Sequence, residues 1–105
     1  MKNEYGITLG RNGYAPSIVQ SGEECFFCGA ESDLIRHEIY FGVANRDRSK
    51  ALGCWVHLCP NCHTKLHEHR DNSDRTLKEF AQGCAMTHYG WTVEEFRLHF
   101  GKSWV

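Results

Sequence analysis

The chain has 105 residues, of which 41% are hydrophobic, a length and composition that predict a single domain. Its formal net charge is −1 with the histidines neutral, which excludes a protein that binds DNA mainly through a large surplus of positive charge. No stretch is apolar over the length of a membrane span, and no apolar run follows the N-terminal methionine. We therefore expect a reduced, cytoplasmic protein with no membrane partner.

The first 22 residues contain four glycines and mixed polar side chains, which predict an extended or mobile arm. The remainder, residues 23–105, predicts one α+β domain, because short β-rich and helical patterns alternate before the C-terminal half becomes helical. The expected elements in chain order are a short strand near 17–20, a strand over 34–41, a helix over 44–52, a strand over 55–58, a helix over 60–69, a helix that begins after 71–74 and ends at Gly90, and a helix over 93–100.

Two Cys-x-x-Cys pairs lie about thirty residues apart, a spacing that favours a metal site over a disulfide framework. Zinc in a structural role prefers four soft ligands in a closed tetrahedron, and such a site contributes to folding. His63 is an alternative to one thiolate, although adjacent residues of a helix point about 100° apart and do not easily reach one metal. Cys54 and Cys84 are expected to be inert. The predicted ligands of a structural Zn²⁺ are Cys25, Cys28, Cys59 and Cys62.

Two further candidate ligands, His63 and His67, are four residues apart, so on a helix they project from the same face. The best third partner is His37 in the predicted strand. Together the three imidazoles predict a second metal site, for Mg²⁺, Mn²⁺ or Zn²⁺, at which an ion would contact a scissile phosphate. For a histidine taken alone, the alternative is a structural or merely exposed side chain. We keep that interpretation for His57, His69, His88 and His99.

Basic side chains outnumber acidic ones between residues 36 and 70, so the region that holds the candidate ligands is locally basic. On charge and position, Arg46 and Lys65 are candidates for contact with DNA phosphates. The alternative for residues 46–50 is a solvated helix face that binds nothing.

Three motifs of this chain resemble those of the HNH endonuclease superfamily. They are a Cys-x-x-Cys pair, the run His37-Glu38-Ile39, and the run Cys59-Pro60-Asn61-Cys62-His63-x-x-x-His67. The longer pattern resembles the phage recombination-enhancement, RecA-dependent nuclease family, and it covers about residues 25–105. Its further residues here are Arg36, the run Tyr40-Phe41-Gly42, Asn45-Arg46, Ser49, Gly53, Trp55-Val56-His57-Leu58, Leu77-Lys78, Ala81-Gln82, Glu94-Glu95-Phe96 and Phe100-Gly101-Lys102-Ser103-Trp104.

The resemblance implies a small zinc-stapled ββα-metal finger, HNH-like in fold, followed by a helical C-terminal half. It implies that His37, His63 and His67 hold a catalytic divalent metal, with Glu38 at the position of the general base. A glutamate is a weaker proton acceptor than imidazole, and burial would raise its pKa. The asparagine that orients the base in the family falls near Cys54, where this chain has no amide. The implied partners are DNA and a RecA-type recombinase filament.

Two functional hypotheses follow. The first is a metal-dependent DNA endonuclease of phage or prophage origin that acts in recombination, with Glu38, His37 and His63 as catalytic residues and with activity that is weak or depends on a partner. The second is a non-catalytic, zinc-stapled module that binds DNA or a recombination protein.

Overall fold

A computed structural model describes residues 1–105, and it contains a two-stranded sheet and four helices. The predicted α+β class and the order of the elements are confirmed from residue 35 onward. No helix is both long enough and apolar enough to cross a membrane. The elements are β1 (Ile35–Glu38), α1 (Arg46–Ala51), β2 (Trp55–Leu58), α2 (Pro60–His67), α3 (Ser73–Tyr89) and α4 (Val93–Phe100).

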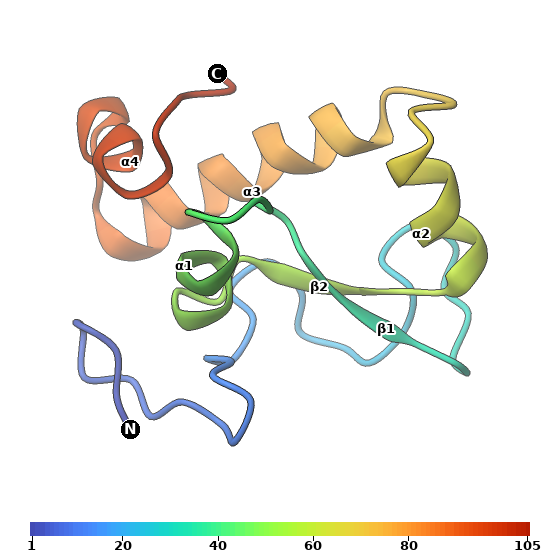
Figure 1. Ribbon diagram of the computed structural model, residues 1–105, viewed down its shortest axis with the longest axis horizontal. Helices are drawn as coiled ribbons and strands as arrows, with labels where there is room; N and C mark the ends of the chain where they lie inside the picture. The colour runs from blue at the N-terminus through green and yellow to red at the C-terminus, as the bar shows by residue number, and fades with distance from the viewer.

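The two strands form an antiparallel hairpin in which Ile35 lies opposite Leu58 and His37 lies opposite Val56. Figure 1 shows the hairpin at the centre of the molecule, with α1 in the connection between its strands, α2 at one end and the long α3 along one side. β1 ends three residues before the predicted strand does. The reason is that Tyr40 donates its backbone N–H to Ser49 Oγ at 3.2 Å instead of to the opposite strand.

The helices begin and end at the residues that the capping chemistry favours. Pro60 occupies the first turn of α2, and α2 ends at His67, two residues before the predicted end, because His69 adopts a left-handed φ of 53°. α4 begins at a complete capping box between Thr92 and Glu95. α3 ends at Gly90, whose φ of 70° is the left-handed conformation that glycine adopts at little cost.

The core lies between the hairpin, α3 and α4, and aromatic side chains from distant parts of the chain meet there. Tyr40 packs against Phe100 and Trp104 with ring centroids 4.5 and 5.0 Å away, and its hydroxyl donates to the backbone carbonyl of Lys78 at 2.7 Å. The buried Gln82 holds the C-terminal segment in place, because its Oε1 accepts the backbone N–H of Trp104 at 2.7 Å.

Residues 15–20, which precede the hairpin in the chain, lie beside β2 but do not form the strand that the sequence predicts near 17–20. The Ser17 side chain accepts the backbone N–H groups of Val19 and Gln20, so the chain turns there instead of extending. Ala15 is buried, and its carbonyl accepts the Trp55 indole N–H at 2.7 Å. These contacts fix the end of the arm against β2.

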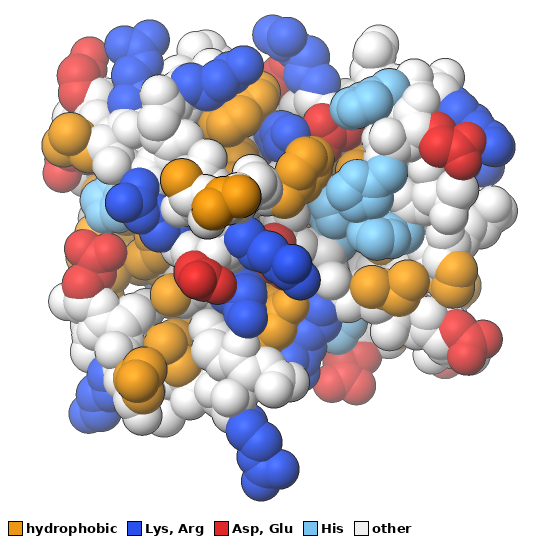
Figure 2. Space-filling view, in the orientation of Figure 1, with side chains coloured by type: hydrophobic (Ala, Val, Ile, Leu, Met, Phe, Trp, Pro, Cys, Tyr) orange, Lys and Arg blue, Asp and Glu red, His pale blue; other side chains and the backbone are white.

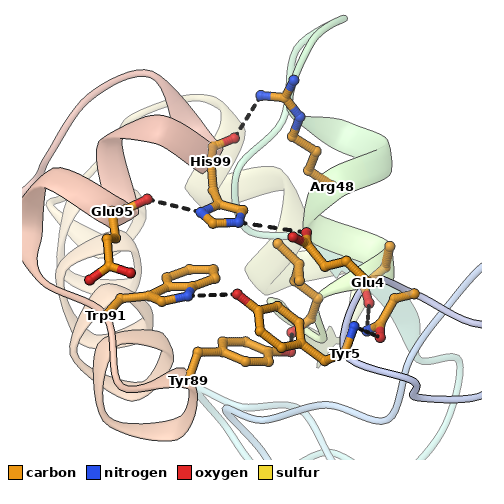
Figure 3. A network of polar contacts seen from close by, with 10 residues as sticks. Glu4, Tyr5, Arg48, Tyr89, Trp91, Glu95 and His99 are labelled. Carbon is orange, nitrogen blue, oxygen red and sulfur yellow. Dashed lines mark hydrogen bonds and ion pairs between the residues drawn. The ribbon is translucent and has the colours of Figure 1, made fainter.

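The beginning of the arm contacts the C-terminal helices, as Figure 3 shows. Tyr5 stacks on Tyr89 at 4.6 Å, and its hydroxyl accepts the Trp91 indole N–H at 2.8 Å. The His99 ring stacks on Trp91 at 4.0 Å, and its Nε2 lies 3.6 Å from Glu4 Oε1. The segment predicted as an extended or mobile arm therefore lies against the domain at both ends.

Candidate metal centres

The first candidate centre consists of four cysteines whose Sγ atoms all lie within 4.8 Å of one another: Cys25, Cys28, Cys59 and Cys62. Each pair comes from a tight turn. Gly29, with φ of 79°, allows the first turn to close, and the backbone N–H of Cys62 donates to Cys59 Sγ at 3.4 Å in the second. All four cysteines are free, so the cluster has the ligands and the size for one metal ion such as zinc.

The thiols of this cluster differ in how readily they ionise. Burial disfavours the charged form of Cys25, yet hydrogen bonds from the backbone at Cys59, Cys28 and Phe27 outweigh it and lower the pKa of Cys25 to about 6. Burial and hydrogen bonds to neighbouring thiols raise the pKa of Cys62. The thiolate form of Cys25 is thus stabilised and that of Cys62 is opposed. A divalent cation bound by the four sulfur atoms would favour the thiolate form of all of them.

The second candidate centre consists of three histidines that offer nitrogen atoms within 4.8 Å of one another: His37, His63 and His67. His63 Nε2 and His67 Nε2 are 3.0 Å apart, and the His37 ring centroid lies 5.3 Å from the centroid of each. Two imidazole nitrogens bound to one ion at about 2.1 Å would lie roughly 3.4 Å apart at a tetrahedral angle and roughly 3 Å apart at an octahedral one. β1 contributes one of these rings and α2 contributes two.

Helical geometry explains why neighbouring residues serve different clusters. Cys62 and His63 are adjacent in α2, so their side chains point about 100° apart. The sequence alternative, in which His63 replaces a thiolate, does not match this arrangement, because His63 lies with the histidines. His67 follows one turn later on the same face as His63.

His37 is buried, and its Nε2 has no hydrogen-bond partner. Burial and the neighbouring rings of His63 and His67 lower its pKa to about 4, so its neutral form persists through the physiological range. A neutral imidazole is the form that binds metal, and an unpaired buried nitrogen is costly unless something occupies it. The three histidines therefore fit a metal ion.

Glu38 lies beside this cluster as a fully hydrogen-bonded carboxylate. It is 8% exposed, and its two oxygens accept hydrogen bonds from Tyr14 Oη and Arg46 Nε, each at 2.7 Å. Burial acts to raise its pKa, but these two bonds and the charge of Arg46 outweigh burial and lower it. Burial therefore acts on the pKa of Glu38 in the direction that the sequence suggests, but Tyr14 and Arg46, two partners that the sequence does not indicate, reverse the net shift.

A cleft of about 630 Å³ lies over the histidines, and it is lined by all three of them together with Arg36, Arg46 and Glu38. Figure 2 shows histidine side chains gathered over the α2 side of this face, with Lys and Arg side chains between them and the α1 side. Of the two predicted phosphate contacts, Arg46 lines the cleft and Lys65 does not. Lys65 is two positions from His63, so it projects about 200° away on α2.

The sequence assigns no role at the site to two residues near the cleft, Tyr14 and Arg36. Tyr14 reaches Glu38 from the N-terminal arm, and nothing in the local pattern around it indicates this long-range contact. Arg36, with its guanidinium 4.7 Å from the Tyr14 ring centroid, is adjacent to His37 on β1, and that adjacency was the available signal. Cys54 is fully buried.

The sequence and the structure were compared with known proteins. No family model, no curated protein and no solved structure matches the chain.

Proposed function

We propose that the protein is a metal-dependent DNA endonuclease with an HNH-like fold. The observation that carries this proposal is the meeting of His37, His63 and His67 in an open cleft, beside a four-cysteine cluster that is formed partly by the same helix. The chain order of strand, short helix, strand, cysteine turn and histidine-bearing helix supports the proposal, since it is the order expected of a ββα-metal finger.

In the proposed reaction the three histidines hold a divalent ion, Mg²⁺, Mn²⁺ or Zn²⁺, which would polarise the scissile phosphate and stabilise the leaving oxygen. Arg46 binds a phosphate of the strand. Its Nε is used by Glu38, so both of its terminal amino groups remain for the two oxygens of one phosphate. Glu38 thereby acts as a positioning residue for Arg46.

Glu38 is also the acceptor for the proton of the attacking water in this proposal. Its lowered pKa keeps it deprotonated but makes it a weak base, and general-base catalysis is most efficient when the pKa is close to the working pH. We therefore expect slow intrinsic hydrolysis that increases when a partner presents the strand. A RecA-type recombinase filament on DNA is the partner that we propose.

A nicking assay tests this function. Supercoiled DNA and recombinase-coated DNA are incubated with the protein and Mg²⁺ or Mn²⁺, and we expect slow nicking that increases on the coated substrate. His63→Ala should abolish it, whereas His88→Ala, which removes an exposed histidine outside the cluster, should not. No nicking under any of these conditions, with wild type equal to His63→Ala, would refute the proposal.

The state of Glu38 favours a second candidate, a zinc-stapled module that binds DNA or a recombination protein without cleaving it. Both oxygens of Glu38 already accept hydrogen bonds, and position 54 holds a cysteine and not an amide that could assist the carboxylate. Such a glutamate can stabilise a binding domain without taking part in catalysis. Metal analysis separates the two candidates. One metal per chain favours the module, and a second metal bound after exposure to Mn²⁺ and lost in His63→Ala favours the nuclease.

A further inference from the structure

The turn that follows β1 presents apolar side chains to solvent at the rim of the histidine cleft. Val43 is fully exposed, and Phe41 remains 37% exposed although its ring lies 5.3 Å from that of His67. Ile35, at the start of β1, lines the same cleft and is 37% exposed as well. These side chains contribute little to the core. Exposed apolar groups that cluster beside a polar cleft are typical of a surface that contacts a ligand.

The turn is held in a fixed shape. Gly42 adopts φ of 101°, and its carbonyl accepts the backbone N–H groups of Asn45 at 3.2 Å and Arg46 at 3.0 Å. The Asn45 side chain donates to the carbonyl of Phe100 at 3.1 Å, which ties the turn to α4. A side chain on a turn of this kind is presented to a ligand with little loss of conformational entropy.

Phe41 is fixed as well, because Lys78 Nζ lies 4.1 Å from its ring centroid and the His37 ring lies 5.9 Å away. Its remaining exposed surface borders the cleft. The ring is thus held in one orientation next to the place where the metal-bound strand would pass.

The charges around the turn narrow the class of ligand. Arg36 and Arg46 line the cleft with the apolar groups, and the acids there are Glu38, which is paired with Arg46, and Asp47. An apolar protein segment would leave the guanidinium groups facing a surface that cannot pair with them. A nucleic-acid strand satisfies both kinds of group, since its phosphates pair with arginine and its bases contact apolar and aromatic side chains.

We propose that the Phe41–Val43 turn contacts an unpaired nucleobase beside the phosphate held at the histidine cluster, and so favours single-stranded or locally unstacked nucleic acid. This inference rests on the proposed function for the position of the strand. Phe41 provides the surface against which the base stacks, Val43 contacts the neighbouring base, and Arg36 and Arg46 bind the flanking phosphates.

The test measures binding without cleavage. Zinc-loaded protein is titrated into single-stranded oligonucleotides that carry 2-aminopurine, with Ca²⁺ in place of Mg²⁺ or Mn²⁺, and the fluorescence and anisotropy are followed. We expect a change in 2-aminopurine fluorescence with wild type, and weaker binding to a duplex of the same sequence. Phe41→Leu should remove the fluorescence change and weaken binding by roughly 5- to 150-fold, the range for loss of one stacked base. Val43→Ser, which removes the contact with the neighbouring base, should weaken binding by a smaller factor.

Leu98→Ser is the matched control, because Leu98 is 79% exposed on α4 and is not among the residues that line the cleft. It should bind as wild type does. Val43→Ser that binds single strands as tightly as wild type, or Leu98→Ser that weakens binding equally, would overturn the proposal. The binding assay needs no hydrolysis, so its outcome and that of the nicking assay are independent. If the protein nicks DNA but Val43→Ser does not change binding, only the proposed role of the turn is refuted. If binding depends on the turn but no DNA is nicked, only the proposed nuclease activity is refuted.

Discussion

Replacing Cys62 with serine tests whether the four-cysteine cluster stabilises the fold through a metal. The side chain is only partly buried, so its own packing contributes little, and a hydroxyl keeps its approximate size. What the substitution removes is one of four thiolates from a cluster whose Sγ atoms lie within 4.8 Å of one another. A large loss of stability would therefore come from the metal.

The expected magnitude follows from the small size of the elements that the cluster joins. Strands β1 and β2 have four residues each, and an isolated two-stranded hairpin is marginal in water. Structural zinc in small domains contributes about 10–16 kcal/mol of apparent binding free energy, against a total unfolding free energy of about 5–15 kcal/mol for a domain. Losing even about 3 kcal/mol would lower the melting temperature by roughly 12–24 °C.

The assay combines metal analysis with thermal melts followed by circular dichroism. We expect about one zinc per chain in wild type purified without added Mn²⁺, and a Cys62→Ser variant that is zinc-free and either unfolded or melting at least roughly 12 °C lower. Cys84→Ser is the control, since Cys84 is equally half-buried but lies outside the cluster. A zinc-free Cys62→Ser protein that melts like wild type would refute the reasoning.

Three further predictions concern single residues. His37 has a folded pKa of about 4 against 6.5 in the unfolded chain, so without a second metal its contribution to stability decreases as pH falls below 6.5. The difference in unfolding free energy between wild type and His37→Gln should shrink by about 1.5 kcal/mol between pH 6.5 and 5, and a constant difference contradicts this. Tyr14→Phe removes a hydrogen bond that lowers the pKa of Glu38, so this pKa should rise in an NMR titration, and an unchanged value refutes the assignment. Gln82→Leu leaves the Trp104 N–H unpaired and should cost about 1–3 kcal/mol, which chemical denaturation measures; equal stability would mean that the C-terminal segment does not depend on this contact.

The parts of the structure that sequence predicted are those determined by local rules. Metal-ligand spacing indicated the four cysteines, and helical periodicity placed His63 and His67 on one face. The capping residue Thr92 and the terminal glycine Gly90 located helix ends within a residue. Each of these signals depends on residues that lie within a few positions of one another, so a single sequence is enough to read them.

The parts that sequence did not predict depend on contacts between distant residues. Tyr14 and Glu38 are 24 residues apart, and their hydrogen bond changes the direction of the pKa shift that burial alone would give. β1 is shorter than predicted because the Ser49 side chain replaces a strand partner at Tyr40. Gln82 is fully buried although it is polar, because the C-terminal segment folds back to pair with it. No residue pattern around these positions indicates which distant residue each of them contacts.

The two candidate centres depend on each other unequally, because α2 serves both. Its first turn carries Cys62, so a metal bound by the cysteines fixes where the helix begins and thereby where His63 and His67 face. The cysteine cluster needs no contribution from the histidines, since its four ligands lie in two turns that end at or before Cys62, whereas His63 and His67 follow later in α2. His63→Ala should therefore keep the zinc and the fold while losing affinity for a second metal. Cys62→Ser should lose the second metal together with the first, and a variant that lacks zinc but still binds Mn²⁺ as wild type does would show that the histidines are positioned by the hairpin and the core alone.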